Sequence, residues 1–353
     1  MKILVTGAAG FIGAAVLNRL LKERHDIVGI DNFSNYYDPS MKFARLDLLG
    51  ISGRDIPSET PVASSMYPRL KFIKTDIKDS EATDRLFEEN GFDTVIHLAG
   101  QPGVRYSISN PRSYISNNID VFVNILEGCR NHGIKHLVFA SSSSVYGLNA
   151  NVPFSESDGI AHPVSLYAAT KKSNELMAHV YSHLYNLPVT GLRFFTVYGP
   201  WGRPDMSPHL FIDAILHDRP INVFNNGDML RDFTYIDDIA ESVARIADII
   251  PHPDAEWDAR IANPSSSCAP YRIYNVGCQH PVRLIDYISC IESAIGKEAK
   301  KIFLPMQPGD VYQTNSDSSS LAAAIGYSPS TTIEEGIRKT VEWFKSYYND
   351  IMN

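Results

Sequence analysis

A tyrosine and a lysine stand four residues apart in the stretch SLYAATKKSNEL, and this spacing could support acid–base chemistry. On a helix, residues four apart share a face, so Tyr167 and Lys171 would lie side by side. A phenol with a pKa of about 10 is a poor base at neutral pH, but a neighbouring ammonium group favours the phenolate. The pair could therefore take a proton from a substrate hydroxyl. The alternative is a surface tyrosine that stacks on a lysine stem.

The spacing alone does not identify such a pair, because Tyr67 and Lys71 have the same spacing. That second pair contains Pro68 and lies between a loop and a strand, so it is not helical. Ser165 precedes the first pair and is a plausible N-cap for a helix over 165–186. We therefore assign the acid–base role to the first pair only.

A run of four serines, Ser141 to Ser144, follows the apolar segment HLVFA at 136–140. Serine runs are usually flexible linkers. This run lies between two apolar residues, Ala140 and Val145, so we expect it to be ordered. Its purpose depends on which other residues converge on the end of the strand.

Three glycines in VTGAAGFIG follow the first expected strand and open a helix. Gly7 allows a tight turn, Gly10 lets the backbone approach a pyrophosphate, and Gly13 lets the helix pack on the strand. Asp31 ends the second strand, where a carboxylate can bind both ribose hydroxyls of NAD and repel the 2′-phosphate of NADP. No Arg or Lys follows within ten residues to offset its charge. The alternative is a glycine-rich turn that caps an ordinary helix.

These residues together predict NAD as the cofactor. The positive nicotinamide of NAD⁺ would add to the effect of Lys171 and favour the phenolate of Tyr167.

Two other strand ends fit the same cofactor. Asp76 ends the third expected strand, where it could accept a hydrogen bond from the adenine amino group; alternatively, it caps a helix over 79–88. The segment HLAGQ at 97–101 ends the fourth strand with the small residues Ala99 and Gly100. Such small residues would let a dinucleotide lie across the carboxyl ends of the strands.

Short β-rich runs alternate with longer amphipathic ones in the first part of the chain. We expect strands at 2–6, 26–30, 70–74, 93–98, 136–140 and 188–194, and helices at 11–24, 111–132 and 165–186. This alternation predicts an α/β fold: a Rossmann-type, doubly wound parallel sheet with a smaller, partly interleaved C-terminal domain. We place the NAD-binding domain at 1–195, with later segments around 230–250 returning to it, and the substrate domain mainly at 196–353. Two aperiodic segments rich in Pro and Ser, 51–69 and 250–271, are expected to be surface loops.

The composition narrows the class of protein. The 353 residues carry a net charge of −8, which argues against binding to nucleic acid. No stretch approaches the roughly 18 apolar residues of a membrane span, and the chain opens on a strand without an apolar leader. Four scattered cysteines without a CxxC pair fit a reduced, cytoplasmic protein. His179 and His183 have no evident third ligand, so no metal site is expected.

Several motifs together resemble the extended short-chain dehydrogenase/reductase family of nucleotide-sugar enzymes. They are TGAAGFIG, SSSVYG, YAATK, RDFTYIDDIA and QPGD, and the resemblance covers essentially the whole chain. It implies that Ser142 works with Tyr167 and Lys171, that the substrate is a UDP-sugar, and that helices 111–132 and 165–186 form a homodimer. It also implies further cofactor contacts from Phe11, Ile12, Asn32, Ile77, Leu98, Asn117 and Phe194.

The stretch FFTVYGPWGRPDM, with GVRYS and HPVSLYAATKK, resembles the UDP-glucuronate 4-epimerases more narrowly. That resemblance implies reversible epimerisation of UDP-glucuronate to UDP-galacturonate through a 4-keto intermediate. A ketone β to a carboxylate loses CO₂ easily when the C–C bond aligns with the carbonyl π system. Such an enzyme must therefore hold the carboxylate out of that alignment.

Hydroxyl donors and a guanidinium suit this restraint, since Arg binds a carboxylate through two parallel hydrogen bonds. We assign it to Ser143, Ser144, Thr196 and Arg203. The alternative is that the two serines only cap the strand end and that the guanidinium pairs with a nearby acid such as Asp205.

The resemblance implies that Arg231 binds the substrate diphosphate and that Asp310 lies near the uridine ribose. Relatives often carry Arg where this chain has Gln307, and Arg105 could compensate for that missing cation. Decarboxylating relatives carry Glu at the position of Ser144. A UDP-glucose-type 4-epimerase, a UDP-glucuronate decarboxylase and a non-catalytic NAD-sensing protein remain as alternatives. The complete set of catalytic residues argues against the last of these.

Overall fold

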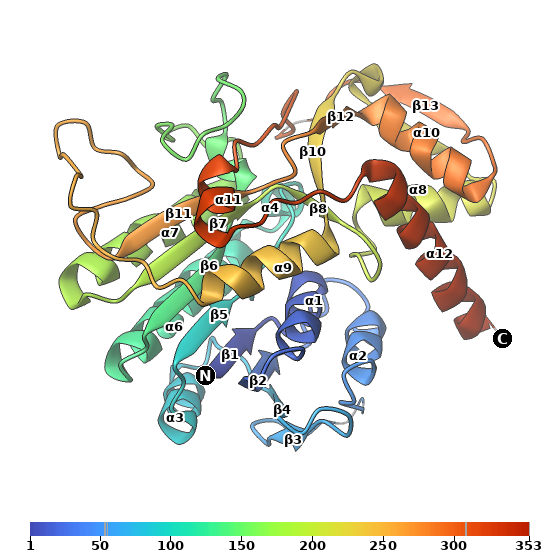
Figure 1. The fold of residues 1–353 in the computed structure, drawn as a ribbon. Coiled ribbons are helices and arrows are strands. Elements are labelled where there is room, and N and C mark those ends of the chain that lie inside the picture. Colours follow the sequence, from blue (N-terminus) through green and yellow to red (C-terminus); the bar gives the residue numbers. More distant parts are fainter. Residues whose placement is uncertain (53, 55, 308, 353) are drawn as a thin grey trace.

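An eight-stranded sheet forms the centre of the molecule (Figure 1). The computed structural model describes residues 1–52, 54, 56–307 and 309–352. The strand order is β11-β7-β6-β5-β1-β2-β4-β3, and every neighbouring pair is parallel except β3 with β4. The strands are β1 (Lys2–Thr6), β2 (Asp26–Asp31), β3 (Val62–Ala63), β4 (Leu70–Lys74), β5 (Thr94–His97), β6 (His136–Ser142), β7 (Val189–Phe194) and β11 (Tyr271–Val276).

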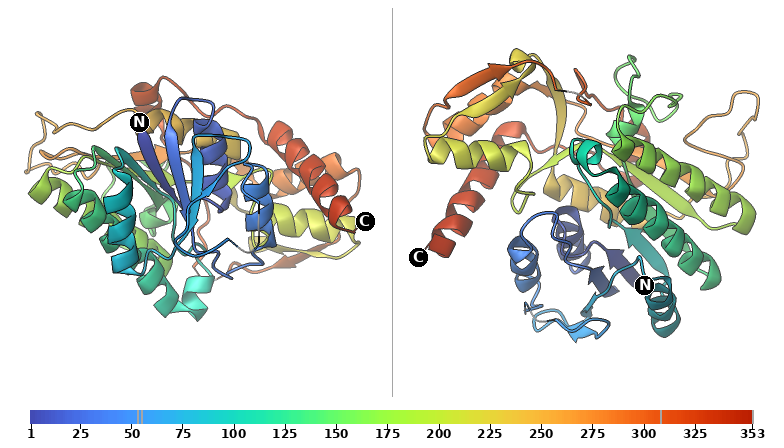
Figure 2. Two further views of the ribbon diagram at one scale, coloured as in Figure 1. Left: turned by 90° about the horizontal axis from the view of Figure 1, so that it is seen from below. Right: turned by 180° about the vertical axis from the view of Figure 1, so that it is seen from behind.

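All six strands predicted from the sequence are present in this sheet, with bounds that differ by at most two residues. Helices cover both of its faces, as a parallel sheet of apolar strands requires. On one face α1 (Phe11–Leu20) packs against α9 (Ile236–Ala247), and on the other α6 (Val121–Asn131) packs between α3 (Ser80–Asn90) and α7 (Leu166–Tyr185). Seen from behind in Figure 2, α6 and α7 lie in front of the sheet. The predicted doubly wound fold is therefore confirmed.

The expected single helix over 111–132 is divided. After α4 (Tyr106–Ser109), the chain forms α5 (Pro111–Tyr114), a π-helical turn at Ile115–Asp120, and then α6. Widened turns of this kind often occur at functional sites. The turn carries Asn118, whose buried side chain hydrogen-bonds outside its own helix.

The later part of the chain forms two small sheets and five helices within the described residues. The three-stranded sheet has the order β12-β10-β8, and β13 pairs with β9 in the other. The strands are β8 (Thr196–Tyr198), β9 (Ile221–Phe224), β10 (Leu230–Tyr235), β12 (Pro281–Arg283) and β13 (Lys301–Leu304). The helices are α8 (Ser207–Leu216), α9, α10 (Leu284–Ile295), α11 (Ser319–Ile325) and α12 (Ile333–Met352).

Two late elements, α9 and β11, belong to the layers of the large sheet rather than to the small ones. The strand β11 was not predicted, because only its pairing with β7 distinguishes it from the loop before it. That loop, within 250–271, projects from the edge of the sheet (Figure 1). The exact division of the chain into two domains stays a prediction.

The other expected surface loop, 51–69, is only partly on the surface. Ile51 and Ile56 are buried in the main hydrophobic core, and Val62–Ala63 forms the edge strand β3 beside β4. Residues 53 and 55 of that segment lie outside the described residues. The burial of apolar side chains within a Pro- and Ser-rich segment explains why composition alone misassigned it.

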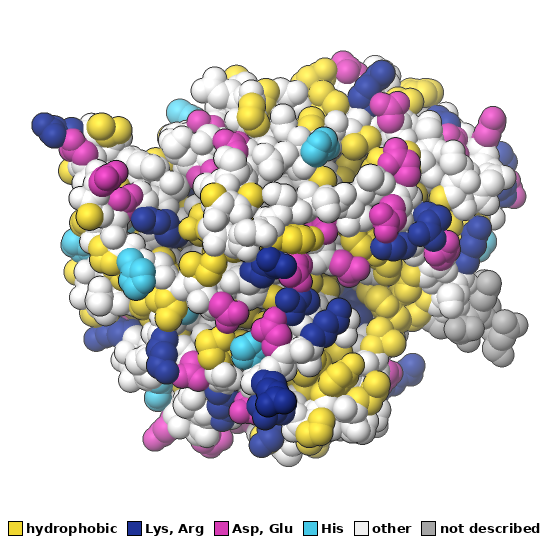
Figure 3. Space-filling view, viewed as in Figure 1, with side chains coloured by type: hydrophobic (Ala, Val, Ile, Leu, Met, Phe, Trp, Pro, Cys, Tyr) yellow, Lys and Arg dark blue, Asp and Glu magenta, His cyan; other side chains and the backbone are white. Residues whose placement is uncertain are grey.

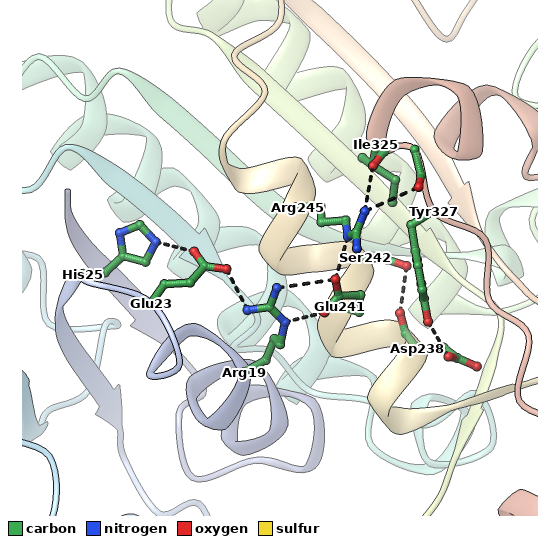
Figure 4. Close-up of polar contacts among 10 residues, drawn as sticks. Arg19, Glu23, His25, Asp238, Glu241, Ser242, Arg245, Ile325 and Tyr327 are labelled. Carbon is green, nitrogen blue, oxygen red and sulfur yellow. Dashed lines mark hydrogen bonds and ion pairs between the residues drawn. The ribbon is translucent and has the colours of Figure 1, made fainter.

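An ion-pair cluster joins α1 to α9 and to the chain that follows α11 (Figure 4). Arg19 on α1 pairs with Glu241 on α9. Arg245 on α9 binds the same carboxylate at 2.6 Å and donates from Nη1 to the Ile325 carbonyl oxygen at 3.3 Å. This cluster fastens segments that are distant in the sequence.

Charged side chains of both signs are interspersed on the face of the molecule drawn in Figure 3. Among the described residues, no helix combines the length and the apolar character that a membrane span needs.

Candidate active site

One cavity of about 1380 Å³ lies where the strands of the large sheet end. Pockets for one small molecule commonly measure roughly 300–1,000 Å³, so this cavity has room for more than one ligand. Every site residue predicted from the sequence lines it. They are Gly7, Gly10, Phe11, Ile12, Gly13, Asp31, Asn32, Asp76, Ile77, Leu98, Ala99, Gly100, Arg105, Asn117, Ser142, Ser143, Ser144, Tyr167, Lys171, Phe194, Thr196, Arg203, Arg231 and Asp310.

The glycine loop between β1 and α1 has no room for side chains. Gly7 has a φ of 68°, in the left-handed region, and a Cβ on it would lie 2.9 Å from the Ala99 nitrogen. A Cβ on Gly13 would lie 2.0 Å from the Gly7 carbonyl oxygen. Larger residues would therefore push the loop away from α1. Bare backbone faces the cavity at the start of this helix, where its N–H groups and dipole favour an anion.

Tyr167 and Lys171 lie one turn apart on α7, and both line the cavity. The Ser165 hydroxyl accepts a hydrogen bond from the Ala168 nitrogen at 3.1 Å and so caps the helix, as predicted. Lys171 Nζ donates to the Ala140 carbonyl oxygen at 2.9 Å. This bond holds the ammonium group beside the end of β6.

The protein's own groups do not make Tyr167 a ready base. Burial raises the pKa of its phenol, and the Ser142 hydroxyl and the charge of Arg203 lower it only in part. Burial also lowers the pKa of Lys171 to about 8. Because burial keeps the pKa of the phenol above its usual value, the positive nicotinamide expected from the sequence would favour the phenolate further.

The serine run divides into separate roles. The strand β6 continues through Ser142, and a 3-10 turn, Ser143–Tyr146, follows it. The Ser142 hydroxyl accepts a hydrogen bond from the Ser144 nitrogen at 3.2 Å and donates to the Ser144 hydroxyl at 3.1 Å. The alternative interpretation of the sequence was that Ser143 and Ser144 cap the end of the strand. In the structure, Ser142 makes the capping hydrogen bond instead.

Ser141 instead anchors α7. Its hydroxyl donates to Glu175 Oε1 at 2.7 Å, and the same carboxylate binds Arg193 through bonds of 2.9 and 3.0 Å. Both charged side chains are fully buried. Burial alone would raise the pKa of Glu175, but the Arg193 guanidinium holds it below its usual range. This buried pair fastens α7 to β7.

We expect Glu175→Ala to lower the free energy of unfolding by about 3–5 kcal/mol, because it leaves the buried charge of Arg193 without a carboxylate partner. The matched control is Glu342→Ala, which removes an exposed pair with Arg338 and should change the value by less than about 1 kcal/mol. Urea unfolding measures both variants. Equal losses in the two variants would contradict the assignment.

Arg203 is held by Asp205, the pairing that the alternative interpretation expected. Nε and Nη2 of the guanidinium donate to the two carboxylate oxygens at 2.9 and 2.7 Å. The Tyr36 hydroxyl donates to the same carboxylate at 3.0 Å. Nη1 of Arg203 makes no hydrogen bond to any described residue, so the edge of the guanidinium that carries Nη1 is open. The guanidinium is thus fixed by one edge while it lines the cavity with Tyr167.

Arg231 and Arg105 converge on Asp310. Arg231 Nη2 lies 2.9 Å from Asp310 Oδ1, and Arg105 Nη2 lies 3.4 Å from Asp310 Oδ2. Arg105 also lies over the ring of Phe224, with 4.9 Å between the guanidinium carbon and the ring centre. Two cations therefore flank one carboxylate at this end of the cavity. Pro308, within the QPGD element, lies outside the described residues.

The model of the NAD dependent epimerase/dehydratase family matches residues 3–263. The chain belongs to this family. A protein of Escherichia coli O111:H- named as an uncharacterized 37.6 kDa protein is 53% identical over 348 residues, which are 99% of each chain. A probable UDP-glucuronate 4-epimerase of Rhizobium meliloti (strain 1021) is 43% identical over 349 residues, 99% of this chain and 98% of the relative.

Among solved structures, a UDP-glucuronic acid 4-epimerase from Bacillus cereus in complex with UDP-glucuronic acid and NAD has a TM-score of 0.83 and 34% identity. The match covers 99% of this chain and 100% of that one. As a member of the epimerase/dehydratase family, this chain uses NAD as its cofactor. Its activity is that of a nucleotide-sugar epimerase or dehydratase. The glycine loop, in which a Cβ at Gly7 or Gly13 would clash with the backbone, fits the cofactor's diphosphate.

The ribose end of the cofactor site differs from expectation. Asp31 was predicted to lack a neighbouring cation, but Lys42 Nζ lies 3.1 Å from its Oδ1, and both side chains are buried. The lysine stands on α2 (Ser40–Asp47), just beyond the ten residues considered. Because Lys42 offsets part of the charge of Asp31, repulsion alone is a weaker argument against NADP than the sequence indicated.

Asp76 does not cap the following helix. The N-cap of α3 is Asp79, whose side chain accepts a hydrogen bond from the Ala82 nitrogen at 3.0 Å. Asp76 lines the cavity instead and contacts Asn32 at 3.3 Å. The alternative interpretation was therefore wrong, and the adenine contact stays a prediction.

Sequence reasoning missed Asn118 in the π-helical turn. Its Oδ1 accepts a hydrogen bond from the Gln101 nitrogen at 2.7 Å, and its Nδ2 donates to the Thr170 hydroxyl at 3.0 Å. Thr170 lies between Tyr167 and Lys171 on α7. Asn118 therefore ties α7 to the loop after β5. Only its neighbour Asn117 was predicted to serve the site.

The two histidines set aside in the sequence lie on α7, and His179 Nε2 contacts the Ser267 hydroxyl at 2.9 Å. Within the described part of the chain, no three His, Cys, Asp or Glu side chains are grouped so that they could hold a metal ion.

Proposed function

We propose that this protein catalyses the reversible C4 epimerisation of UDP-glucuronate to UDP-galacturonate. One observation carries the proposal: a guanidinium and a row of hydroxyls, Arg203 with Ser142, Ser143 and Ser144, line the same cavity as Tyr167. A neutral sugar would need no guanidinium beside the catalytic phenol. The names of the Rhizobium relative and the Bacillus structure support this substrate.

The proposed acid–base step uses residues of α7 and β6. Tyr167, as phenolate, takes the proton from the O4 hydroxyl, and Ser142 positions that hydroxyl by a hydrogen bond. Lys171, held at the Ala140 carbonyl oxygen, keeps a positive charge near the phenolate. When bound, NAD⁺ supplies reversible hydride acceptance. The keto-sugar then rotates so that the opposite face of C4 is turned toward the cofactor. Tyr167 returns the proton to O4 as the ketone is reduced.

The remaining hydroxyls restrain the sugar carboxylate in this proposal. Ser143, Ser144 and Thr196 donate to the carboxylate oxygens, and Arg203 binds them through the edge that Asp205 leaves open. These contacts keep the C5–C6 bond out of line with the C4 carbonyl. The 4-keto intermediate therefore survives until it is reduced. Ser144, in place of the Glu of decarboxylating relatives, adds no negative charge beside the substrate.

Incubation with UDP-glucuronate and, separately, with UDP-glucose tests the function. We expect UDP-galacturonate from the first substrate and little or no UDP-galactose from the second. Products are identified by chromatography and mass spectrometry. A UDP-pentose, whose sugar has lost the carboxylate, as the main product would identify a decarboxylase. Turnover of UDP-glucose alone would identify a UDP-glucose-type epimerase, and no turnover of either substrate would leave a binding protein.

We also propose that the protein is a homodimer, through the outer face of α7. Leu176, Val180 and Leu184 recur every four residues along that helix and are each about half exposed. Such a stripe on one helix face is typical of helix–helix contacts. We expect Val180→Glu to give monomers in sedimentation analysis, whereas Ile302→Glu, at an exposed apolar position on β13, should leave the dimer intact. A wild-type monomer at micromolar concentration would contradict this proposal.

A further inference from the structure

A buried arginine on α2 has no acidic partner among the described residues. Arg45 is only 1% exposed, yet no carboxylate oxygen of a described residue lies within ion-pair distance of its guanidinium. Removing a charge from water is unfavourable unless other groups compensate for it. Arg45 is not required by the acid–base chemistry, and it does not line the cavity. Its retention in the core therefore calls for another explanation.

The guanidinium of Arg45 is bonded to three segments that are far apart in the sequence. Nη1 donates to the Ala9 carbonyl oxygen at 3.1 Å and to the Tyr37 hydroxyl at 2.8 Å. Nε and Nη2 donate to the Trp201 carbonyl oxygen at 3.1 and 2.7 Å. Ala9 lies in the glycine loop, and Trp201 lies two residues before Arg203. One side chain thus bridges the cofactor loop and the turn that carries the proposed carboxylate ligand.

The turn at Trp201 needs such support. Trp201 has a φ of 63°, a left-handed conformation that is unfavourable for a residue with a side chain. Its ring packs against Trp343 and Tyr347 of α12, with centroids 5.2 and 4.9 Å away. The views in Figures 1 and 2 agree that α2 and α12 lie on the same side of the molecule. The turn is therefore held by α12 through its ring and by Arg45 through its carbonyl group.

We propose that Arg45 is a positioning residue that ties the glycine loop of the NAD site to the turn that presents Arg203. The planar guanidinium of Arg45 donates hydrogen bonds to two carbonyl groups at once. The single ammonium nitrogen of a lysine could not bind both with the same geometry. Binding of the cofactor at the loop and binding of a carboxylate at the turn are then linked through one rigid side chain. The carboxylate half of this inference rests on the proposed function, and the cofactor half does not.

The test is Arg45→Lys, loaded with NAD alongside the wild-type protein. Two measurements are made: the rate at which NAD is released, and the calorimetric affinities for UDP-glucuronate and UDP-glucose. Loss of one hydrogen bond to a charged group commonly weakens an interaction about 10-fold or more. We therefore expect about 10-fold faster NAD release and about 10-fold weaker UDP-glucuronate binding, with UDP-glucose changed by less than about threefold.

The matched control is Arg245→Lys. Arg245 also bridges two segments, Glu241 and the carbonyl group of Ile325, but it lies in the ion-pair cluster of α9 (Figure 4) and does not line the cavity. It should lower the melting temperature and leave both measurements unchanged. If Arg45→Lys behaves in the same way, or alters only one of the two measurements although the wild-type protein prefers UDP-glucuronate, the inference is overturned.

A milder variant allows the inference to be tested even if Arg45→Lys does not fold. Tyr37→Phe removes one contact of the Arg45 guanidinium and should change NAD release and UDP-glucuronate affinity in the same direction, by about threefold. Unchanged values in this variant would count against the inference. A wild-type protein that does not prefer UDP-glucuronate would count against the proposed function. The NAD release rate would still decide whether Arg45 holds the glycine loop.

Discussion

Replacing Tyr167 with phenylalanine is expected to lower the turnover of UDP-glucuronate by roughly 10²–10⁴-fold, the usual contribution of a general base. The phenol lies on the cavity wall one turn from Lys171, and it is the residue to which the account assigns the O4 proton. Substrate binding should be largely kept, because the ring and its edge-on contact with Tyr114 remain. Steady-state kinetics and calorimetric binding on the same preparation separate the two effects.

Tyr67→Phe is the matched control for this substitution. Tyr67 also stands four residues before a lysine, but Lys71 lies in β4 and the tyrosine lies outside any helix. We expect this variant to retain its activity within about twofold, as most substitutions away from a site do. If Tyr167→Phe kept activity within a few-fold of the wild type, the proton would have to leave by another route.

The second large effect is expected from Arg203→Ala. Loss of a charge-assisted contact between guanidinium and carboxylate should weaken UDP-glucuronate binding by about 2–4 kcal/mol. The selectivity for UDP-glucuronate over UDP-glucose should fall with it, because the neutral sugar does not use the guanidinium. The 4-keto intermediate would still form, since Ser142, Tyr167 and Lys171 are untouched.

Without Arg203, the sugar carboxylate can rotate into line with the C4 carbonyl and leave as CO₂. A larger share of turnovers should then end as a decarboxylated 4-ketopentose product, which keeps the C4 ketone because the hydride stays on the reduced cofactor. Mass spectrometry of the products and absorbance at the wavelength of reduced nicotinamide measure this share. Ser144→Ala should show the same change to a smaller extent.

Arg260→Ala is the matched control for Arg203→Ala. Arg260 also pairs with an aspartate two residues away, Asp258, but it is 88% exposed on the loop before β11. This variant should keep the affinity, the selectivity and the product ratio of the wild type. If Arg203→Ala and Ser144→Ala lose rate while product ratio and selectivity stay unchanged, the serine run serves only the end of the strand.

The parts of the site that the sequence predicted are those whose geometry is local. The glycine loop, Asp31 and the Tyr167–Lys171 pair follow from a strand, a turn or a helix face. The apolar runs of β1 and β6 likewise predict strands whose ends meet at one edge of a sheet. These features need no knowledge of what lies across the cavity.

The parts that were missed depend on contacts between distant segments. Lys42 reaches Asp31 from the next helix, and Arg45 reaches the turn at Trp201 from 156 residues earlier in the chain. Strand β11 follows a long loop before it pairs with β7. The pairing of Arg203 with Asp205 was predicted only as an alternative to binding of a substrate carboxylate. The sequence could not decide between them, because both partners offer a carboxylate to the guanidinium.

The transfer of hydrogen away from C4 and back to it is tested with UDP-glucuronate that carries deuterium at C4, incubated with the wild-type protein in ordinary water. We expect UDP-galacturonate with the deuterium retained at C4 and the carboxylate intact, because the hydrogen removed from C4 returns to the opposite face of the same carbon. Mass spectrometry and NMR of the product read out both features. A product that has exchanged its C4 deuterium for solvent hydrogen, or that has lost its carboxylate, would contradict the account.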